Sequence, residues 1–104
     1  MTIQINTDKT LTGENRSSDF FKSQIAEALK RFEDHITRIE VHLKDENGKN
    51  EGFNKISCLL EARLEGRQPI AITNRADTID LAVSGAIDKI KTAIGNILGK
   101  NQKH

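Results

Sequence analysis

The sequence predicts an α+β fold, a two-layer β-α-β-β-β-α sandwich in which both helices cover one face of a four-stranded sheet. Two observations lead to this prediction. Several short segments alternate apolar and polar residues, which is the pattern of a strand with one buried face. Two longer segments repeat apolar residues at helical spacing and therefore predict amphipathic helices. These apolar faces must be buried against one another, and a layer of helices on a sheet achieves this.

The first two elements are a strand and a helix. Residues 2–6 alternate and predict a short strand, and the polar residues 7–16 predict a loop. A helix is expected from Ser17 or Ser18, either of which can cap it, to about Asp34. Its apolar stripe consists of Phe21, Ile25, Ala28, Leu29 and Phe32.

Three strands follow along the chain. They are predicted over residues 36–44, 55–65 and 69–74, where apolar and polar side chains alternate. The polar residues 45–54, rich in Asn and Gly, predict a hairpin loop, and Gly66 begins the next turn. The sheet face away from the helices is expected to meet water or a partner and to carry Gln4, Glu40, His42, Lys44, Glu61 and Arg63.

The last helix is predicted to begin at a cap on Asp77 or Thr78. Gly85 lies inside it and predicts close packing against a neighbour, because glycine weakens a helix interior. Gly95 and Gly99 predict fraying toward its end. Eight side chains are expected to be almost completely buried in the resulting core: Leu29, Ile39, Val41, Cys58, Leu60, Ile72, Val83 and Ile87.

Length and composition limit the function classes. The 104 residues predict a single domain over 1–104. The sequence has no apolar stretch long enough to span a membrane and no secretory signal, so we expect a cytoplasmic protein. A single cysteine, Cys58, excludes an internal disulfide, and the three histidines are widely separated. We therefore expect no metal site, no cofactor, no small-molecule substrate and no enzymatic activity.

The distribution of charge is more informative than the net charge of +1. Residues 33–66 hold eight acids against five bases, whereas residues 89–104 contain four lysines and no acid. A basic helix end can bind phosphate, but it can equally complement the dipole of its own helix. Both interpretations remain open on charge alone.

Two stretches resemble a known family, the short ribosome hibernation promoting factors and ribosome-associated translation inhibitors. The stretch from Asp34-His35-Ile36 to Leu43-Lys44 resembles the helix-to-strand junction of that family, and Ile87-Asp88-Lys89-Ile90 resembles its last-helix motif. The expected order of elements is also that of the family. The family usually has a dense basic run in the last helix, and here residues 92–99 carry no charge.

The resemblance implies a ribosome-associated modulator of translation that binds the RNA of the small ribosomal subunit and promotes an inactive, hibernating state. Lys89 and Lys100 match basic positions of the family. Phosphate recognition by basic side chains adds further candidates, because exposed aromatic stacking platforms are not expected. The candidate RNA-binding residues are Lys22, Lys30, Arg31, Arg75, Lys89, Lys91 and Lys100.

Two other interpretations remain open. The chain is alternatively a small protein-interaction module that keeps the fold and has lost ribosomal RNA binding, or an RNA-binding regulator unrelated to ribosomes. Comigration with ribosomal particles would support the ribosome-associated modulator over the protein-interaction module.

Overall fold

The computed structural model describes residues 1–7, 18–45 and 56–102. The predicted loop over 7–16 and hairpin over 45–54 lie almost entirely outside these residues, as does the candidate cap Ser17. The observed order of elements is the predicted one. The elements are β1 (Thr2–Thr7), α1 (Ser18–Ala28), the 3-10 helix η2 (Lys30–Phe32), β2 (Ile36–Asp45), β3 (Ile56–Leu64), β4 (Ile70–Ala76) and α2 (Ile79–Gln102).

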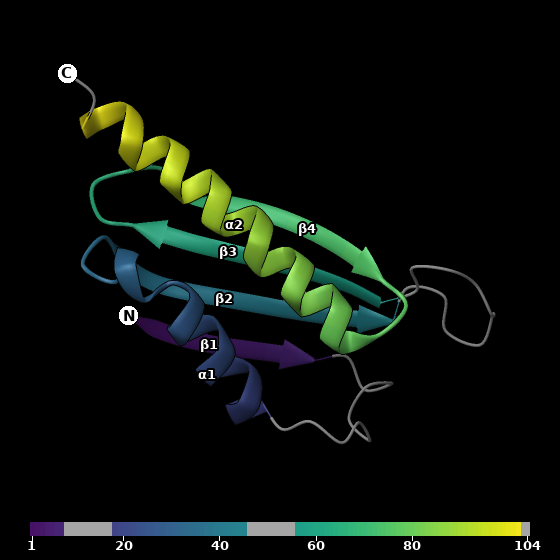
Figure 1. Cartoon of the computed structure of the whole chain (residues 1–104). Helices are drawn as coiled ribbons and strands as arrows, with labels where there is room; N and C mark the ends of the chain where they lie inside the picture. The colour runs from purple at the N-terminus through teal and green to yellow at the C-terminus, as the bar shows by residue number, and fades with distance from the viewer. Residues whose placement is uncertain (8–17, 46–55, 103–104) are drawn as a thin grey trace.

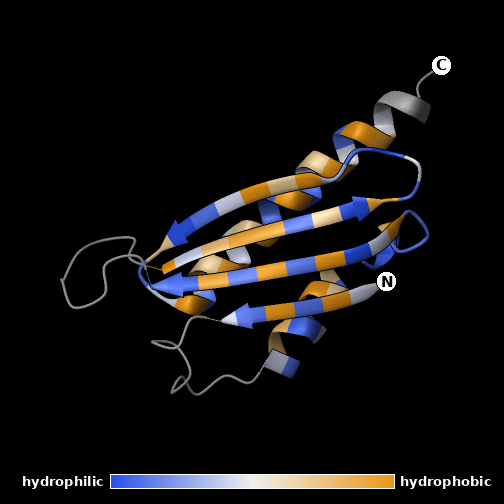
Figure 2. Cartoon of the chain, turned by 180° about the vertical axis from the view of Figure 1, so that it is seen from behind, coloured by the Kyte–Doolittle hydropathy of each residue, from blue (hydrophilic) through white to orange (hydrophobic). Residues whose placement is uncertain are grey.

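The strands form one mixed sheet in the order β1-β2-β3-β4. β1 is parallel to β2, with α1 in the connection between them, and the remaining neighbours are antiparallel. Both helices lie on one face of this sheet (Figure 1). The other face is not covered by a helix and shows alternating hydrophilic and hydrophobic residues along each strand (Figure 2). The predicted two-layer α+β architecture is confirmed.

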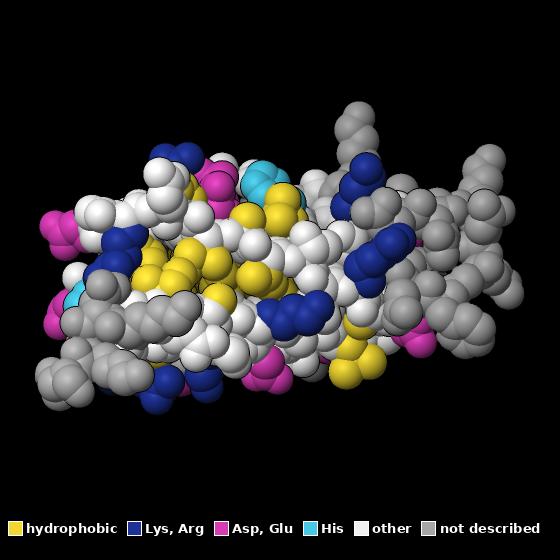
Figure 3. All heavy atoms as spheres, turned by 90° about the horizontal axis from the view of Figure 1, so that it is seen from above, with side chains coloured by type: hydrophobic (Ala, Val, Ile, Leu, Met, Phe, Trp, Pro, Cys, Tyr) yellow, Lys and Arg dark blue, Asp and Glu magenta, His cyan; other side chains and the backbone are white. Residues whose placement is uncertain are grey.

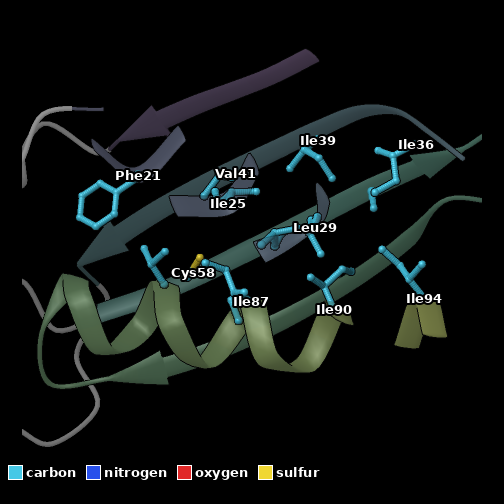
Figure 4. Close-up of a cluster of buried hydrophobic side chains, with 14 of the residues drawn as sticks. Phe21, Ile25, Leu29, Ile36, Ile39, Val41, Cys58, Ile87, Ile90 and Ile94 are labelled. Atoms are coloured by element: carbon cyan, nitrogen blue, oxygen red, sulfur yellow. The ribbon is translucent and has the colours of Figure 1, made fainter. Parts of the chain in front are cut away.

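The core lies between the sheet and the two helices. Phe21, Ile25 and Leu29 approach it from the first helical segment, and Ile87, Ile90 and Ile94 from α2 (Figure 4). Of the eight side chains that were expected to be almost completely buried, seven are buried. The exception is Ile72, which is only half-buried. It lies on the edge strand β4, where no further strand covers its outer side.

The first helix is shorter than predicted. The α-helix ends at Ala28, and Leu29 leaves helical geometry with φ −104° and ψ 11°. The chain then forms the tighter turn η2, in which the Phe32 amide donates to the Leu29 carbonyl at 2.9 Å. Leu29 and Phe32 are both buried. The change of geometry therefore brings two large side chains to the core where a continuous α-helix had been expected.

Helix α2 begins where the sequence predicts and extends further. Thr78 is the cap, because its Oγ1 accepts a hydrogen bond from the Leu81 amide at 3.2 Å. The helix continues through Gly95 and Gly99 to Gln102, and fraying of its end stays a prediction. Ile94 and Leu98 are buried in the core and hold this last part against the sheet.

Candidate nucleic-acid interface

The predicted RNA-binding cations are distributed over four elements. Lys22 is half-buried on α1, and Lys30 and Arg31 are exposed on η2. Lys89 and Lys91 lie on α2, the first exposed and the second half-buried. Lys100 also belongs to α2, but its side chain is outside the described part of the structure. Arg75 is exposed on β4.

Helix α2 separates these cations into two groups. Lys89 points toward β4, where its Nζ donates a hydrogen bond to the Thr73 carbonyl oxygen at 3.1 Å. Gly95 faces the opposite side, because a Cβ at this position would lie 3.9 Å from both Arg31 Nη2 and Phe32 Cζ. Lys91 is one turn before Gly95 on the same helical face. The structure therefore places Lys91 on the η2 side with Arg31, and Lys89 on the β4 side.

The hydrogen bond from Lys89 has a structural meaning. β4 is an edge strand, so its outward-facing carbonyls have no partner strand. Lys89 covers one of these carbonyls while its side chain remains exposed. The lysine that best matched the family therefore has a second role within the fold, which sequence analysis did not predict.

Arg75 does not join the helical cations. The sequence placed it at the entrance to the last helix, but it lies inside β4 opposite Ser57. Helix-facing residues of this strand are Ile72 and Asn74, so strand alternation puts Arg75 on the uncovered face. A flat partner that contacts α1, η2 and α2 cannot contact Arg75 at the same time.

The uncovered face of the sheet carries a hydrogen-bonded cluster around Glu40. Arg38 Nε donates to Glu40 Oε2 at 2.7 Å and also donates to Gln4. The hydrogen bond from Arg38 lowers the pKa of Glu40 below its ordinary value. His42 Nε2 lies 3.6 Å from the other oxygen of Glu40. Arg38 is therefore paired with a carboxylate and is less available to a phosphate than an unpaired arginine.

A view along the edge formed by α2 and β4 shows no single dense basic patch. Lys and Arg side chains are spaced around a band of hydrophobic side chains in this view (Figure 3). Partly buried hydrophobic residues of these two elements include Ile70, Ile72 and Ile97. We therefore look for a cluster of cations that could bind RNA on the other side of α2, which faces η2.

On that side, the chain forms a shallow hollow between η2 and the C-terminal part of α2. Its lining residues are Arg31, Phe32, His35, Gly95, Leu98 and Gly99. The Arg31 guanidinium lies over the Phe32 ring, with 4.6 Å between Cζ and the ring centroid. Sequence analysis named Arg31 but missed His35, because only the packing of η2 against α2 brings both side chains to one site.

We next consider a reactive cysteine, a metal site and a membrane-spanning helix among the described residues. Cys58 is fully buried, and the loss of solvent raises the pKa of its thiol to about 12, which makes it a poor nucleophile. No group of three or more His, Cys, Asp or Glu side chains in the described ranges is arranged to hold a metal ion. Of the helices that the structure describes, none combines the length and apolar character required to cross a bilayer.

Comparison with known proteins identifies the family. The model of the family described as sigma 54 modulation protein / S30EA ribosomal protein matches residues 3–102, so the chain belongs to this family. The fold is similar to that of the Thermus thermophilus Protein Y N-terminal domain, with a TM-score of 0.72 and 16% identity, covering 93% of this chain and 99% of that one. It is also similar to a ribosomal subunit interface protein from Coxiella burnetii, with a TM-score of 0.68 and 18% identity, covering 95% and 99% of the two chains. No curated protein sequence matches the chain.

Proposed function

We propose that this protein is a ribosome-associated modulator of translation that binds the small ribosomal subunit and promotes an inactive state. Membership of the S30EA family over residues 3–102 is the observation that carries the proposal. The similarity of the fold to a ribosomal subunit interface protein supports it. The resemblance found in the sequence points to the same class.

The contact surface that we propose is the helical layer on the η2 side of α2. Arg31 and Lys91 lie on this side, and the sequence from residue 89 onward contains no acid. Phe21 and Phe32 are buried, but Phe20 is exposed on α1, so the expectation of no exposed aromatic ring is wrong at this position. We propose that Lys and Arg contacts to RNA phosphates and the shape of the RNA carry most of the recognition.

A sucrose-gradient profile of stationary-phase lysate, probed for this protein, tests the proposal. We expect the protein to comigrate with small subunits or whole ribosomes, and purified small subunits to bind it directly. If about four phosphates are neutralised, the log of the binding constant falls with the log of salt concentration with a slope of roughly −3 to −4. A signal only at the top of the gradient, together with no binding to purified subunits, contradicts the proposal.

A second candidate function is a protein-interaction module that has kept the fold and lost RNA binding. Two observations favour it. Residues 92–99 of α2 carry no charge, and Lys89 is engaged by the Thr73 carbonyl. Association with ribosomes that does not change between low and moderate salt supports this candidate, because contacts between neutral protein surfaces depend little on counterions.

A further inference from the structure

We infer that the hollow between η2 and α2 is a binding site for a phosphate group, held by Arg31 and His35. The inference deepens the proposed function and rests on it in one respect, namely that the phosphate belongs to the backbone of ribosomal RNA. The binding chemistry itself follows from the residues of the hollow.

The hollow has the size and lining that a phosphate requires. It encloses about 270 Å³ and is formed by Arg31, Phe32 and His35 on one side and by Gly95, Leu98 and Gly99 on the other. A phosphodiester group is smaller than this space, so it enters together with part of its sugar or with water. Arg31 and His35 are both exposed. They therefore offer N–H donors at the surface that an extended polyanion can reach.

The position of the Arg31 guanidinium suits the binding of an anion. Its guanidinium lies over the Phe32 ring, a contact with the ring face that does not use its N–H groups. Among the described residues, Arg31 forms no ion pair with a carboxylate, and Glu33 and Asp34 do not line the hollow. A planar guanidinium of this kind matches phosphate oxygens with two parallel hydrogen bonds.

The glycines of α2 keep the hollow open. Each glycine inside a helix is less stable there than alanine would be. At Gly85 the packing favours glycine, because a Cβ there would collide with the Asn74 side-chain amide. At Gly95 the nearest atoms lie 3.9 Å from such a Cβ, and at Gly99 nothing lies within 4 Å. Packing within the described chain therefore does not require these two glycines, and their lack of a side chain leaves the space between η2 and α2 accessible.

The surroundings favour phosphate over other ligands. Lys91 lies one turn before Gly95, and the acid-free segment of α2 begins just before it. Glu33 and Asp34 follow η2 at the same end of the molecule and would repel an anion, but neither lines the hollow. A nucleobase would need a free aromatic ring, and Phe32 is already buried beneath Arg31. The arrangement therefore suits a phosphate held by cations.

Titration of the whole protein with inorganic phosphate, followed by NMR at constant ionic strength, tests the site without a ribosome. We expect saturable shifts of the Gly95, Leu98 and Gly99 amides and of the Arg31 side-chain Nε–H. The same shifts should be absent in Arg31→Gln and unaffected in Lys44→Gln, which removes an equal charge from the uncovered sheet face. No saturable shift, or shifts centred elsewhere, would overturn the inference. Shifts produced by adenosine but not by phosphate would show a base site and would also overturn it.

Binding to purified small subunits tests the source of the phosphate. Gly99→Leu keeps every charge and fills the hollow, so we expect it to weaken binding several-fold and to reduce the magnitude of the salt slope by about 1. Gly99→Ala, which adds a single methyl group, serves as the matched control. Normal binding by Gly99→Leu would show that ribosomal RNA does not use the hollow. Phosphate shifts in a protein that binds no ribosome would instead contradict the proposed function and leave the phosphate site standing.

Discussion

Cys58 illustrates how burial alone decides the chemistry of a residue. Its side chain is fully buried on β3, and the absence of water around the thiol raises its pKa to about 12. A thiol reacts as its thiolate, so the folded protein should resist alkylation near pH 8. In denaturant the pKa returns to about 8.5 and the thiol becomes reactive.

We therefore predict that iodoacetamide labels Cys58 slowly in the native protein and rapidly in denaturant, as measured by mass spectrometry. The pKa difference has a consequence for stability. The unfolded state releases the thiol proton at lower pH than the folded state, so this group's contribution is complete below about pH 8.5 and declines as pH rises toward 12. Rapid labelling of the native protein at pH 8 would contradict the prediction.

The glycines of α2 allow a matched comparison at single positions. Gly95→Ala gains helix propensity, and its new methyl group meets only ordinary contacts, so we expect a gain of about 0.5–1 kcal/mol in the free energy of unfolding. Gly85→Ala should destabilise, because its methyl group would collide with the Asn74 amide. Urea unfolding of the two variants measures both effects.

The Asn74 amide adds a second reason for the expected loss at Gly85. Its Nδ2 donates to the Ala82 carbonyl at 3.1 Å and also reaches the Leu81 carbonyl. Displacement of Asn74 would break these bonds between β4 and the first turns of α2. Equal stabilisation by both alanines would show that Asn74 moves aside without cost.

At the scale of elements, the strands and helices could be predicted because their patterns are local. Alternation predicted every described strand, and the apolar stripe of α2 predicted the helix with its cap at Thr78. The irregularities depend on neighbours and escaped prediction. Ile36 and Ile39 are three residues apart and both buried, because the register of β2 against β3 shifts between Ile36 and Arg38.

The candidate site was less accessible to sequence reasoning for the same reason. The charge of Lys89, Lys91 and Arg31 was visible in the sequence, but the side of α2 on which each lies was not. The sequence also gave no sign that Lys89 would bond to the Thr73 carbonyl. These facts follow from the place of β4 and η2 beside α2, which is a property of the tertiary structure.

The edge strand β4 leads to a prediction about association. Edge strands expose backbone groups that can pair with another chain, and a lysine over the edge opposes this. We expect Lys89→Ala to increase self-association with protein concentration, as measured by sedimentation velocity, because the Thr73 carbonyl becomes available. Lys91→Ala removes the same charge from the other side of α2 and should not increase self-association. Equal behaviour of the two variants would contradict a protective role for Lys89.

At the scale of the whole molecule, the two layers present surfaces of different character. On the uncovered sheet face Arg38 is paired with Glu40, and Lys44, Arg63 and Arg75 are exposed around this pair. The helical layer brings Arg31 and Lys91 to one side of α2, beside a segment without acids. We expect a polyanion such as ribosomal RNA to approach the η2 side of the helical layer, because the hollow places Arg31 near Lys91 there.

Charge reversal on the two faces tests this orientation. We predict that Arg31→Glu with Lys91→Glu weakens association with small subunits by roughly tenfold or more, because two phosphate contacts become two repulsions. The fold should persist, since Arg31 is exposed, Lys91 is half-buried, and surface substitutions usually change stability by about 0.5 kcal/mol or less. Circular dichroism and thermal unfolding verify that point before binding is measured.

Lys44→Glu with Arg75→Glu is the matched control, because it changes the net charge equally on the uncovered face. We expect this pair of substitutions to change binding to small subunits little. Measuring the binding of both double variants at two salt concentrations distinguishes local phosphate contacts from long-range electrostatic attraction, which salt screens. Equal loss from both pairs would mean that net charge drives association. Loss from the control pair alone would place the RNA on the sheet and would agree with the original assignment of Arg75. Loss from neither pair would favour a partner that recognises the protein without contacting phosphate.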